Sequence, residues 1–427
     1  MASEFYEPTL EYPSADGGTG GCAAGRYFKS AWIGLESSSA REAAESGSPP
    51  WDQTLDAVRE RCAAVFGARF GKEQVTLFHN TTAGVHRVLS RLQHIIGQDS
   101  LTLLTTDLEY PGVIAALDEN WQGRLVIAEV GHLIWEQQGS LVPLALQNAF
   151  MLAEPDVLYL SHVARATGYE LPVGSLLSFA RALNPRLVIV LDGAQAAGNI
   201  LVDSQIVNEV DFYLTSGHKW LGGKPTLGVV LSAPEWMLSD PSQSYSRKFG
   251  SAGTGIAEAL RSFLKALEEF VDPHGLEDPR KRQGRIAAHN TYLAGVFADR
   301  VRHQEEIPGT APHRPTNGIV TIPDVPEGIV MSLVHSGFEV SWLSTEPWRT
   351  VEGGQAPGKQ NRFLIRVDPR VDDVSIREAR LRQTGVGPVF PPLGSMRACF
   401  HLYHGEDDVV ALATAFLAAR ARSDAAI

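Results

Sequence analysis

Short runs of apolar residues that alternate with helical patterns constrain the fold of this chain more than any other feature. The runs are continuous, as in strands that are buried on both faces of a sheet. Such strands are typical of a mainly parallel sheet with helices packed on either side. We predict an α/β domain in which ligands bind beyond the carboxyl ends of the strands. The predicted strands cover residues 75–78, 101–105, 125–130, 157–161, 187–192, 212–215 and 228–232.

The rest of the chain is organised around this sheet. Helical patterns begin at Trp51 and after Asn80, and residues 256–271 form a strongly amphipathic pattern. The charged stretch that follows, residues 272–285, indicates a domain boundary or a long connecting helix. Further on, an α+β pattern consists of predicted strands at 318–322, 338–341, 363–367 and 396–400 and a final helix from Asp407. We predict an N-terminal arm over residues 1–50, a large domain over 51–272 and a smaller domain over 273–427.

Charge and composition exclude several classes of partner. The net charge of −12 and the pI near 5.6 argue against nucleic acid or an anionic membrane. No window holds roughly 18 or more apolar residues, so we expect no membrane span. The acidic N-terminus lacks the apolar core of a signal peptide. The three cysteines, Cys22, Cys62 and Cys399, are too few and too scattered for a disulfide framework. We therefore expect a cytoplasmic protein.

Two polar residues that follow successive predicted strands carry the chemistry. Asp192 ends the run LVIVLD, and Lys219 follows the next strand in the sequence SGHKW. An acid and a lysine placed in this way are what pyridoxal phosphate (PLP) requires. The lysine forms an imine with the cofactor aldehyde, and the carboxylate keeps the pyridine nitrogen protonated, so that the ring accepts electrons. The alternatives are a surface lysine and an aspartate that caps a turn.

Several further residues suit the same cofactor. Thr81 and Thr82 begin a predicted helix, where backbone N–H groups and hydroxyls can bind a phosphate, although simple N-capping explains them equally well. Ser216 and His218 could add phosphate contacts, and His218 could equally be a packed histidine. The amide of Gln195, three residues beyond the strand-ending aspartate, could reach the phenolic oxygen of the cofactor.

Two residues are candidates for ring and substrate contacts. Tyr110 could stack on the pyridine ring, with a core tyrosine as the alternative. Arg397 lies in a predicted strand, and its guanidinium can bind an α-carboxylate bidentately, with a surface salt bridge as the alternative. His401 and His404 have an HxxH spacing, but at strand spacing the two would face opposite sides. We therefore expect no metal site.

Together these segments resemble the class V aminotransferase and cysteine desulfurase-like branch of the fold-type I PLP-dependent enzymes. The resemblance covers about residues 27–418 and implies a mainly parallel large domain, a smaller C-terminal domain and a homodimer with shared active sites. YFKSAWIG resembles the family's N-terminal active-site turn. The other motifs, in the family's order, are HNTTAGV, EY at 109–110, SHVARATGYELPV, DGAQAAG, SGHKWLGG, GT at 253–254 and RACFHLYHGEDDV.

The resemblance also implies a role for each matched residue. It assigns the Schiff base to Lys219, the pyridinium partner to Asp192, and ring stacking to Tyr110. The phenolic oxygen contact falls to Gln195 and the substrate carboxylate to Arg397. Phosphate contacts fall to Thr81, Thr82, Ser216, His218 and Thr254, the last of which would reach the phosphate of the partner subunit.

Departures from the family's pattern bear on the reaction. The loop that carries the nucleophilic cysteine of desulfurases here reads HSGFEVSWLSTEPW, so persulfide formation on a protein thiol is not expected. Arg165 stands where the family often has asparagine, and it would change the electronics of the cofactor or add an anion contact to the substrate. Tyr110 replaces the usual histidine, as in isopenicillin N epimerase-like and antibiotic-biosynthesis members. The roles of Lys29 and Cys22 stay open.

We expect an enzyme of specialised metabolism that acts on an amino acid with a free α-carboxylate. The leading hypothesis is a C–S β-lyase, in which Lys219 removes the α-proton of an S-substituted cysteine and a thiol is released. Arg397 and Arg165 would set which bond breaks. The alternatives are an isopenicillin N epimerase-like epimerase and a decarboxylating deaminase. An aminotransferase is a less favoured alternative. A non-enzymatic PLP-binding regulator is disfavoured, because no DNA-binding helix-turn-helix or basic patch is visible.

Overall fold

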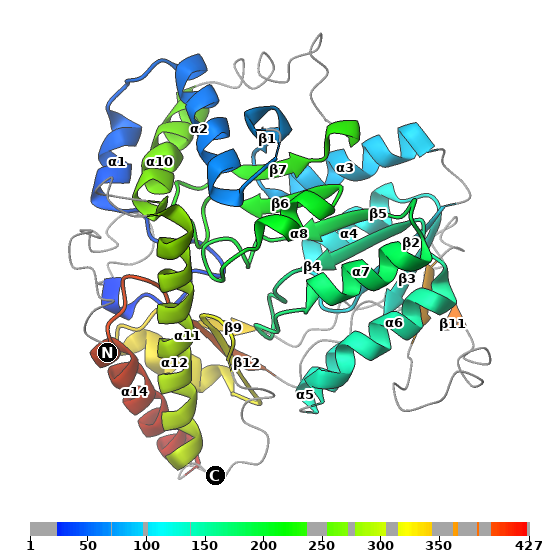
Figure 1. Ribbon diagram of the computed structural model, residues 1–427. Coiled ribbons are helices and arrows are strands. Elements are labelled where there is room, and N and C mark those ends of the chain that lie inside the picture. The colour runs from blue at the N-terminus through cyan, green and yellow to red at the C-terminus, as the bar shows by residue number, and fades with distance from the viewer. Residues whose placement is uncertain are drawn as a thin grey trace.

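The computed structural model describes residues 24–69, 71–96, 101–136, 138–236, 254–271, 278–304, 315–343, 362–365, 382–383 and 394–424. Figure 1 shows a large sheet between layers of helices and, below it, a smaller sheet with its own helices. The long helix α11 (Pro279–Gln304) runs from one to the other. No described helix combines the length and the apolar character that crossing a membrane requires.

A nine-stranded sheet forms the centre of the molecule. Its strands are β1 (Val75–Phe78), β2 (Thr102–Thr106), β3 (Arg124–Ala128), β4 (Val157–Ser161), β5 (Val188–Asp192), β6 (Phe212–Ser216), β7 (Gly228–Ser232), β10 (Arg362–Ile365) and β11 (Arg382–Gln383). The order is β1-β7-β6-β5-β4-β2-β3-β10-β11. Neighbours from β6 through β10 are parallel, whereas β1, β7 and β11 pair antiparallel. The predicted mainly parallel α/β sheet is confirmed.

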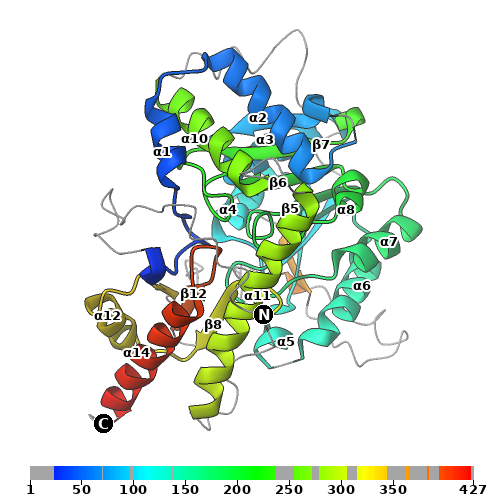
Figure 2. The ribbon, with the colours of Figure 1, turned by 60° about the vertical axis from the view of Figure 1, so that its left-hand side comes forward.

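Helices cover both faces of this sheet, which explains why its strands are apolar throughout. Alternate strand residues, such as Tyr159 and Leu160 of β4, enter opposite cores. One face packs against α3 (Thr81–Ile96) and α4 (Pro111–Asn120). The core on the other face includes α2 (Trp51–Phe66), α5 (Gly131–Trp135), α6 (Val142–Ala153), α7 (Val173–Leu183), α8 (Ser204–Glu209) and α10 (Thr254–Val271). In Figures 1 and 2, α1 (Ser38–Glu45) and α2 both lie against α10.

A three-stranded antiparallel sheet organises the C-terminal part. Its order is β8-β12-β9, with β8 (Ile319–Pro323), β9 (Ser341–Leu343) and β12 (Ser395–Cys399). Helix α11, α12 (Glu327–His335) and α14 (Glu406–Asp424) share an apolar core with this sheet. Phe28 from the N-terminal segment is buried in the same core. The short 3-10 helices are η2 (Ala24–Arg26), η3 (Gly71–Gln74), η4 (Gly139–Leu141) and η5 (Pro234–Trp236).

Two predicted strands of the C-terminal part are corrected. The strand expected at 363–367 is β10, and it pairs with β3 of the large sheet instead of joining the smaller one. In place of the strand expected at 338–341, the structure has β9, which begins at Ser341 and ends at Leu343. Strand pairing over such sequence distances leaves no trace in local periodicity, which explains the first error. The division of the chain at residue 272 stays a prediction, because α11 packs against both α10 and α14.

Candidate active site

Strand ends bring the candidate residues to one edge of the large sheet. Ser161, Asp192 and Ser216 end β4, β5 and β6, and strand alternation places all three on the face that packs against α3. In the strand register Ser161 lies directly beside Asp192. Thr81 Oγ1 donates a hydrogen bond to the Thr215 carbonyl at 3.1 Å, which joins the start of α3 to the end of β6.

Asp192 is a buried carboxylate whose orientation is fixed. It accepts hydrogen bonds from the Ala194 N–H at 2.8 Å and from the Tyr159 hydroxyl at 2.9 Å. Burial raises the pKa of Asp192, while the nearby charge of Lys219 and both hydrogen bonds lower it. Sequence reasoning missed Tyr159. The one signal for it was its place two residues before Ser161, on the same face of β4.

A second buried carboxyl group, Glu109, lies near Asp192. Ser161 donates to it through its main-chain N–H at 3.1 Å and through Oγ at 2.5 Å, and Thr106 Oγ1 donates at 2.8 Å. Burial raises the pKa of Glu109 to about 8, and the charge of Asp192 adds to this shift. Glu109 is therefore mostly protonated at neutral pH. The sequence singled out Glu109 only as part of a motif.

Lys219 lies in the turn that follows β6. Burial lowers its pKa to about 8; Asp192 opposes this decrease, and Arg165 and Arg397 add to it. Its Nζ lies 6.0 Å from the centre of the Tyr110 ring. A larger share of this amine is uncharged at neutral pH than for an exposed lysine. An uncharged amine is what a nucleophile or a general base needs.

The predicted phosphate residues gather around the first turn of α3. Thr81 and Thr82 occupy this turn, whose N–H groups have no acceptor within the helix. The cap is Asn80 and not a threonine, because Asn80 Oδ1 accepts from the Ala83 N–H at 2.8 Å. Gly228 of β7 packs so closely that a Cβ there would lie 2.7 Å from the Thr81 nitrogen. The turn is thus held firmly, with its N–H groups at the site edge.

Ser216 and His218 add polar groups after the end of β6. Ser216 Oγ lies 3.2 Å from His218 Nδ1. Burial lowers the pKa of His218 to about 4, and the charge of Lys219 lowers it as well, so the ring is neutral at pH 7. Helix α10 begins at Thr254, but the side chain of Thr254 lies outside the described residues. Its predicted phosphate contact therefore stays a prediction.

Gln195 has protein partners that the sequence did not indicate. Its Nε2 donates to the Ala31 carbonyl at 2.9 Å, and its Oε1 accepts from the Trp220 indole N–H at 2.9 Å. The amide thereby joins the N-terminal segment to the segment that follows Lys219. A glutamine side-chain amide has two N–H groups, so one remains for the predicted contact to the phenolic oxygen.

Three predicted residues meet near Lys219. Arg397 of β12 is buried, and its Nη1 donates to the Arg165 main-chain carbonyl at 3.1 Å. The guanidinium carbon of Arg165 lies 5.2 Å from the centre of the Tyr110 ring. Tyr110 itself is 41% exposed. The two alternatives weighed from the sequence, a core tyrosine at 110 and a surface salt bridge at 397, therefore do not describe these residues.

The N-terminal segment supports the lysine turn from behind. Gly34 packs so tightly that a Cβ there would lie 1.8 Å from the Lys219 carbonyl oxygen. Lys29, whose role the sequence left open, forms an ion pair with Glu339. This pair ties the segment to the residues just before β9. Residues 1–23, including Cys22, lie outside the described residues.

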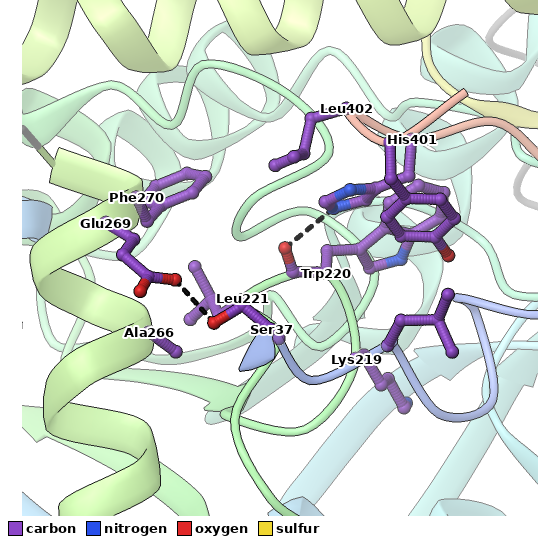
Figure 3. A pocket seen from close by; sticks show the side chains of 12 residues that line it. Ser37, Lys219, Trp220, Leu221, Ala266, Glu269, Phe270, His401 and Leu402 are labelled. Atoms are coloured by element: carbon purple, nitrogen blue, oxygen red, sulfur yellow. Dashed lines mark hydrogen bonds between the residues drawn. The ribbon is translucent and has the colours of Figure 1, made fainter. Parts of the chain in front are cut away.

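A pocket lies between α10, the N-terminal segment and the loop after β12 (Figure 3). Ser37 donates a hydrogen bond to Glu269 at 2.7 Å, and His401 Nε2 donates to the Trp220 carbonyl at 2.8 Å. Lys219 lies at the edge of this pocket. These contacts support the turn that carries the lysine.

The residues present fit PLP. An amine of lowered pKa and an oriented carboxylate follow adjacent strands, and their charges interact. The first turn of α3, with Ser216 and His218 nearby, offers neutral donors for a phosphate. Arg397 Nε is buried without a hydrogen-bond partner among the described residues, so a donor is left for an anionic ligand. In known PLP enzymes the same set of groups holds the cofactor at its aldehyde, ring nitrogen and phosphate.

Comparison with known proteins shows which family this chain resembles. Residues 36–237 match the family model of class-V aminotransferases. A cysteine desulfurase of Cronobacter sakazakii is 29% identical over 191 residues, which is 44% of this chain and 45% of that protein. An isopenicillin N epimerase of Amycolatopsis lactamdurans is 31% identical over 170 residues, or 38% of this chain and 40% of that protein. The chain thus spans less than half the length of these curated relatives.

Solved structures extend the likeness to nearly the whole chain. The cysteine desulfurase CsdA from Escherichia coli has a TM-score of 0.66 at 18% identity and covers 96% of both chains. The cystine C-S lyase C-DES, solved with its product cysteine persulfide, has a TM-score of 0.66 at 18% identity and covers 92% of this chain and 97% of its own. At these identities the likeness shows the fold. PLP, the cofactor predicted from the sequence, is confirmed as the cofactor of this family. The resemblance to class-V aminotransferases that the sequence indicated is therefore confirmed over residues 36–237, and the fold is that of the solved cysteine desulfurases.

Proposed function

We propose that this protein is a PLP-dependent lyase that carries out β-elimination on an S-substituted cysteine. The observation that carries the proposal is the placement of Asp192 at the end of β5 and of Lys219 in the turn after the adjacent strand β6, with Arg397 buried nearby. When bound, PLP supplies an electron-accepting ring that stabilises negative charge at the substrate Cα. The protein must then bind the substrate carboxylate, remove the α-proton and keep the ring nitrogen protonated.

Each of these tasks has a residue. Lys219 would hold the cofactor and would remove the α-proton of the substrate at Nζ, for which its lowered pKa suits it. Asp192, oriented by Tyr159 and Ala194, would be the acid that keeps the ring nitrogen protonated. Arg397 binds the α-carboxylate. The Cα–H and Cβ–S bonds break, the sulfur leaves as a thiol with the Cβ–S electron pair, and the remainder hydrolyses to pyruvate and ammonia.

Cysteine usage favours elimination over desulfuration. A desulfurase needs an accessible thiolate that receives the sulfur atom. Cys62 and Cys399 are both buried, and burial raises the pKa of both thiols. Among the described residues, no thiol is placed to accept sulfur. The sulfur of the substrate would therefore leave on the small-molecule thiol.

Epimerisation at Cα is the second candidate, because an isopenicillin N epimerase is 31% identical over part of the chain. Epimerisation would also begin with removal of the α-proton, but a proton would then return to the opposite face of Cα. Tyr110, whose ring lies 6.0 Å from Lys219 Nζ, is the residue that we would test as a second proton carrier. We further propose a homodimer with shared sites and a cytoplasmic location.

A substrate screen tests the proposal. Purified protein loaded with PLP is incubated with a series of S-alkyl cysteines in deuterated water, and pyruvate, free thiol, carbon dioxide and deuterium at Cα are measured. We expect pyruvate and thiol in equal amounts. Deuterium at Cα without pyruvate would identify an epimerase, and carbon dioxide a decarboxylating deaminase. Amino transfer to an added keto acid would identify an aminotransferase.

A further inference from the structure

We infer that Arg165 and Arg397 form a paired receptor for two anionic groups, so that the substrate carries a second carboxylate on its side chain. The inference rests on the proposed function and names the substrate class of the same site. Arg397 would take the α-carboxylate, and Arg165 the distal one. On a β-lyase, this class is a cysteine whose sulfur bears a carboxyalkyl group.

The two guanidinium groups share one neighbourhood. Arg397 Nη1 donates to the main-chain carbonyl of Arg165 at 3.1 Å, so the head of one arginine lies against the backbone of the other. The charges interact, because Arg397 contributes to the lowered pKa of Arg165, after burial. Both arginines also contribute to the lowered pKa of Lys219. The charges of Arg165, Arg397 and Lys219 therefore act on one another within a single neighbourhood.

The charges of the two arginines lack an acidic partner among the described residues. Neither arginine forms an ion pair with a carboxylate in the part of the chain that the structure describes. The nearby acid Glu109 is instead held by Ser161 and Thr106. Asp192 is occupied by Tyr159 and the Ala194 N–H. The buried guanidinium of Arg397 and the half-buried one of Arg165 are costly without acids unless a ligand supplies negative charge.

Arg165 is held in a way that suits a ligand. The half-buried guanidinium lies 5.2 Å from the centre of the Tyr110 ring, an arrangement that positions a cation without using its N–H groups. Its five N–H donors therefore remain for an anion. Tyr110 is 41% exposed, so this part of the site is open to a side chain that extends away from Lys219.

The second anion could come from the substrate or from the phenolic oxygen of the cofactor, and one experiment separates the two. Binding of succinate, glutarate, adipate and butyrate to the PLP-loaded protein is measured by calorimetry. The visible absorbance of the loaded protein is titrated with pH in the absence of these ligands. The variants are Arg165→Gln and Arg165→Lys, with Arg186→Gln, an exposed arginine, as the matched control.

We expect a dicarboxylate to bind the wild-type protein more tightly than butyrate. Arg165→Gln should weaken binding of the best dicarboxylate by roughly 10- to 100-fold, because a charge-assisted hydrogen bond is lost. Binding of butyrate should not change. Arg165→Lys should recover part of this loss, and Arg186→Gln should match the wild type. The absorbance titration should stay unchanged in all variants.

Two results overturn the inference while leaving the proposed function intact. One is equal binding of dicarboxylates and butyrate. The other is a shifted absorbance titration in Arg165→Gln without any change in dicarboxylate selectivity, which would place Arg165 on the cofactor. If borohydride trapping of the wild-type protein finds no cofactor adduct on Lys219, the proposed function itself fails.

Discussion

Two clusters of buried ionisable residues differ in what their polar atoms bind. The sheet-edge cluster consists of Glu109, Arg165, Asp192, Lys219 and Arg397, and the histidine cluster consists of His289, His401 and His404. Burial shifts the pKa values in both. A displaced pKa alone therefore does not distinguish a site from a structural core.

In the histidine cluster, ring nitrogens bind the main chain. His404 Nδ1 accepts from the His401 N–H at 3.0 Å, and its Nε2 donates to the Tyr27 carbonyl at 2.9 Å. His289 Nε2 donates to the His404 carbonyl at 3.0 Å. Both His401 and His404 lie beyond Cys399, the last residue of β12, so the strand spacing expected from the sequence does not apply to them. The accepting Nδ1 of His404 requires a neutral ring, and the cluster serves to attach the N-terminal segment.

In the sheet-edge cluster, cations and an acid face one another without closing into ion pairs. Lys219 interacts with the charges of Asp192, Arg165 and Arg397, yet no ion pair joins it to a described residue. Charges that interact but stay unpaired are available to a ligand. The contrast teaches that the partners of a buried ionisable group, more than its burial, indicate function.

Removal of the amine should have the largest effect. Lys219→Ala should lose the borohydride-trapped adduct and lower turnover by roughly 10²–10⁴-fold, because it loses both the covalent attachment and the base. Mass spectrometry and pyruvate release are the readouts. Lys265→Ala, which changes a partly exposed lysine of α10, is the control. Unchanged turnover in Lys219→Ala would remove the lysine from the chemistry.

Neutralising the acid should come next. Asp192→Asn keeps the size of the side chain but removes the charge opposite the ring nitrogen. We expect turnover to fall by about 10²–10³-fold, the range for loss of one preorganised electrostatic contact. The visible spectrum of the loaded protein should change as well. A variant with wild-type turnover and spectrum would place the ring nitrogen elsewhere.

The histidine cluster should respond in stability and not in chemistry. His404→Gln cannot reproduce both the contact to Tyr27 and that to the His401 N–H, and it loses the ring stacked on Phe28. We expect the free energy of unfolding to fall by about 1–3 kcal/mol, measured in urea, with turnover of the folded enzyme unchanged. Loss of turnover without loss of stability would contradict the structural role.

The same cluster predicts a pH dependence of stability. Burial lowers the pKa of His401 to about 4 and that of His404 to about 3, from an ordinary value of 6.5. Between pH 6.5 and 4 the unfolded chain binds protons that the folded protein does not. The free energy of unfolding should therefore fall as the pH falls, by up to about 1.4 kcal/mol per pH unit for each group. His404→Gln should have a shallower slope than the wild type.

The smallest effect is expected from the hydrogen bond that orients Asp192. Tyr159→Phe removes one hydroxyl that donates to the carboxylate at 2.9 Å. We expect transition-state stabilisation to fall by about 0.5–1.5 kcal/mol, which lowers kcat by roughly 2- to 13-fold and leaves KM unchanged. The pH profile of kcat should shift, because the pKa of Asp192 rises when this donor is lost. An unaltered profile would make Tyr159 a packing residue.

Much of the fold was predictable because local patterns determine it. Continuous apolar runs predicted the strands of the large sheet from β1 to β7, and they also marked the strand end that Asp192 occupies, whereas β6 runs one residue further than predicted, to Ser216. The N-terminus of α3 at Thr81 was predicted from its polar start. The strand β10 was predicted, but its place in the large sheet was not, because its partner β3 lies far away in the sequence and pairing leaves no local signal.

The sequence by itself determined the chemistry-bearing residue types, their order and the strand ends at which Lys219 and Asp192 stand. Periodicity and turn chemistry encode these features within a few residues. Tertiary structure alone decided that Tyr159 orients Asp192, that Ala31 and Trp220 hold Gln195, and that Arg165 lies against Arg397. Such contacts join residues far apart in the chain, and they depend on how distant elements pack, which no local pattern records.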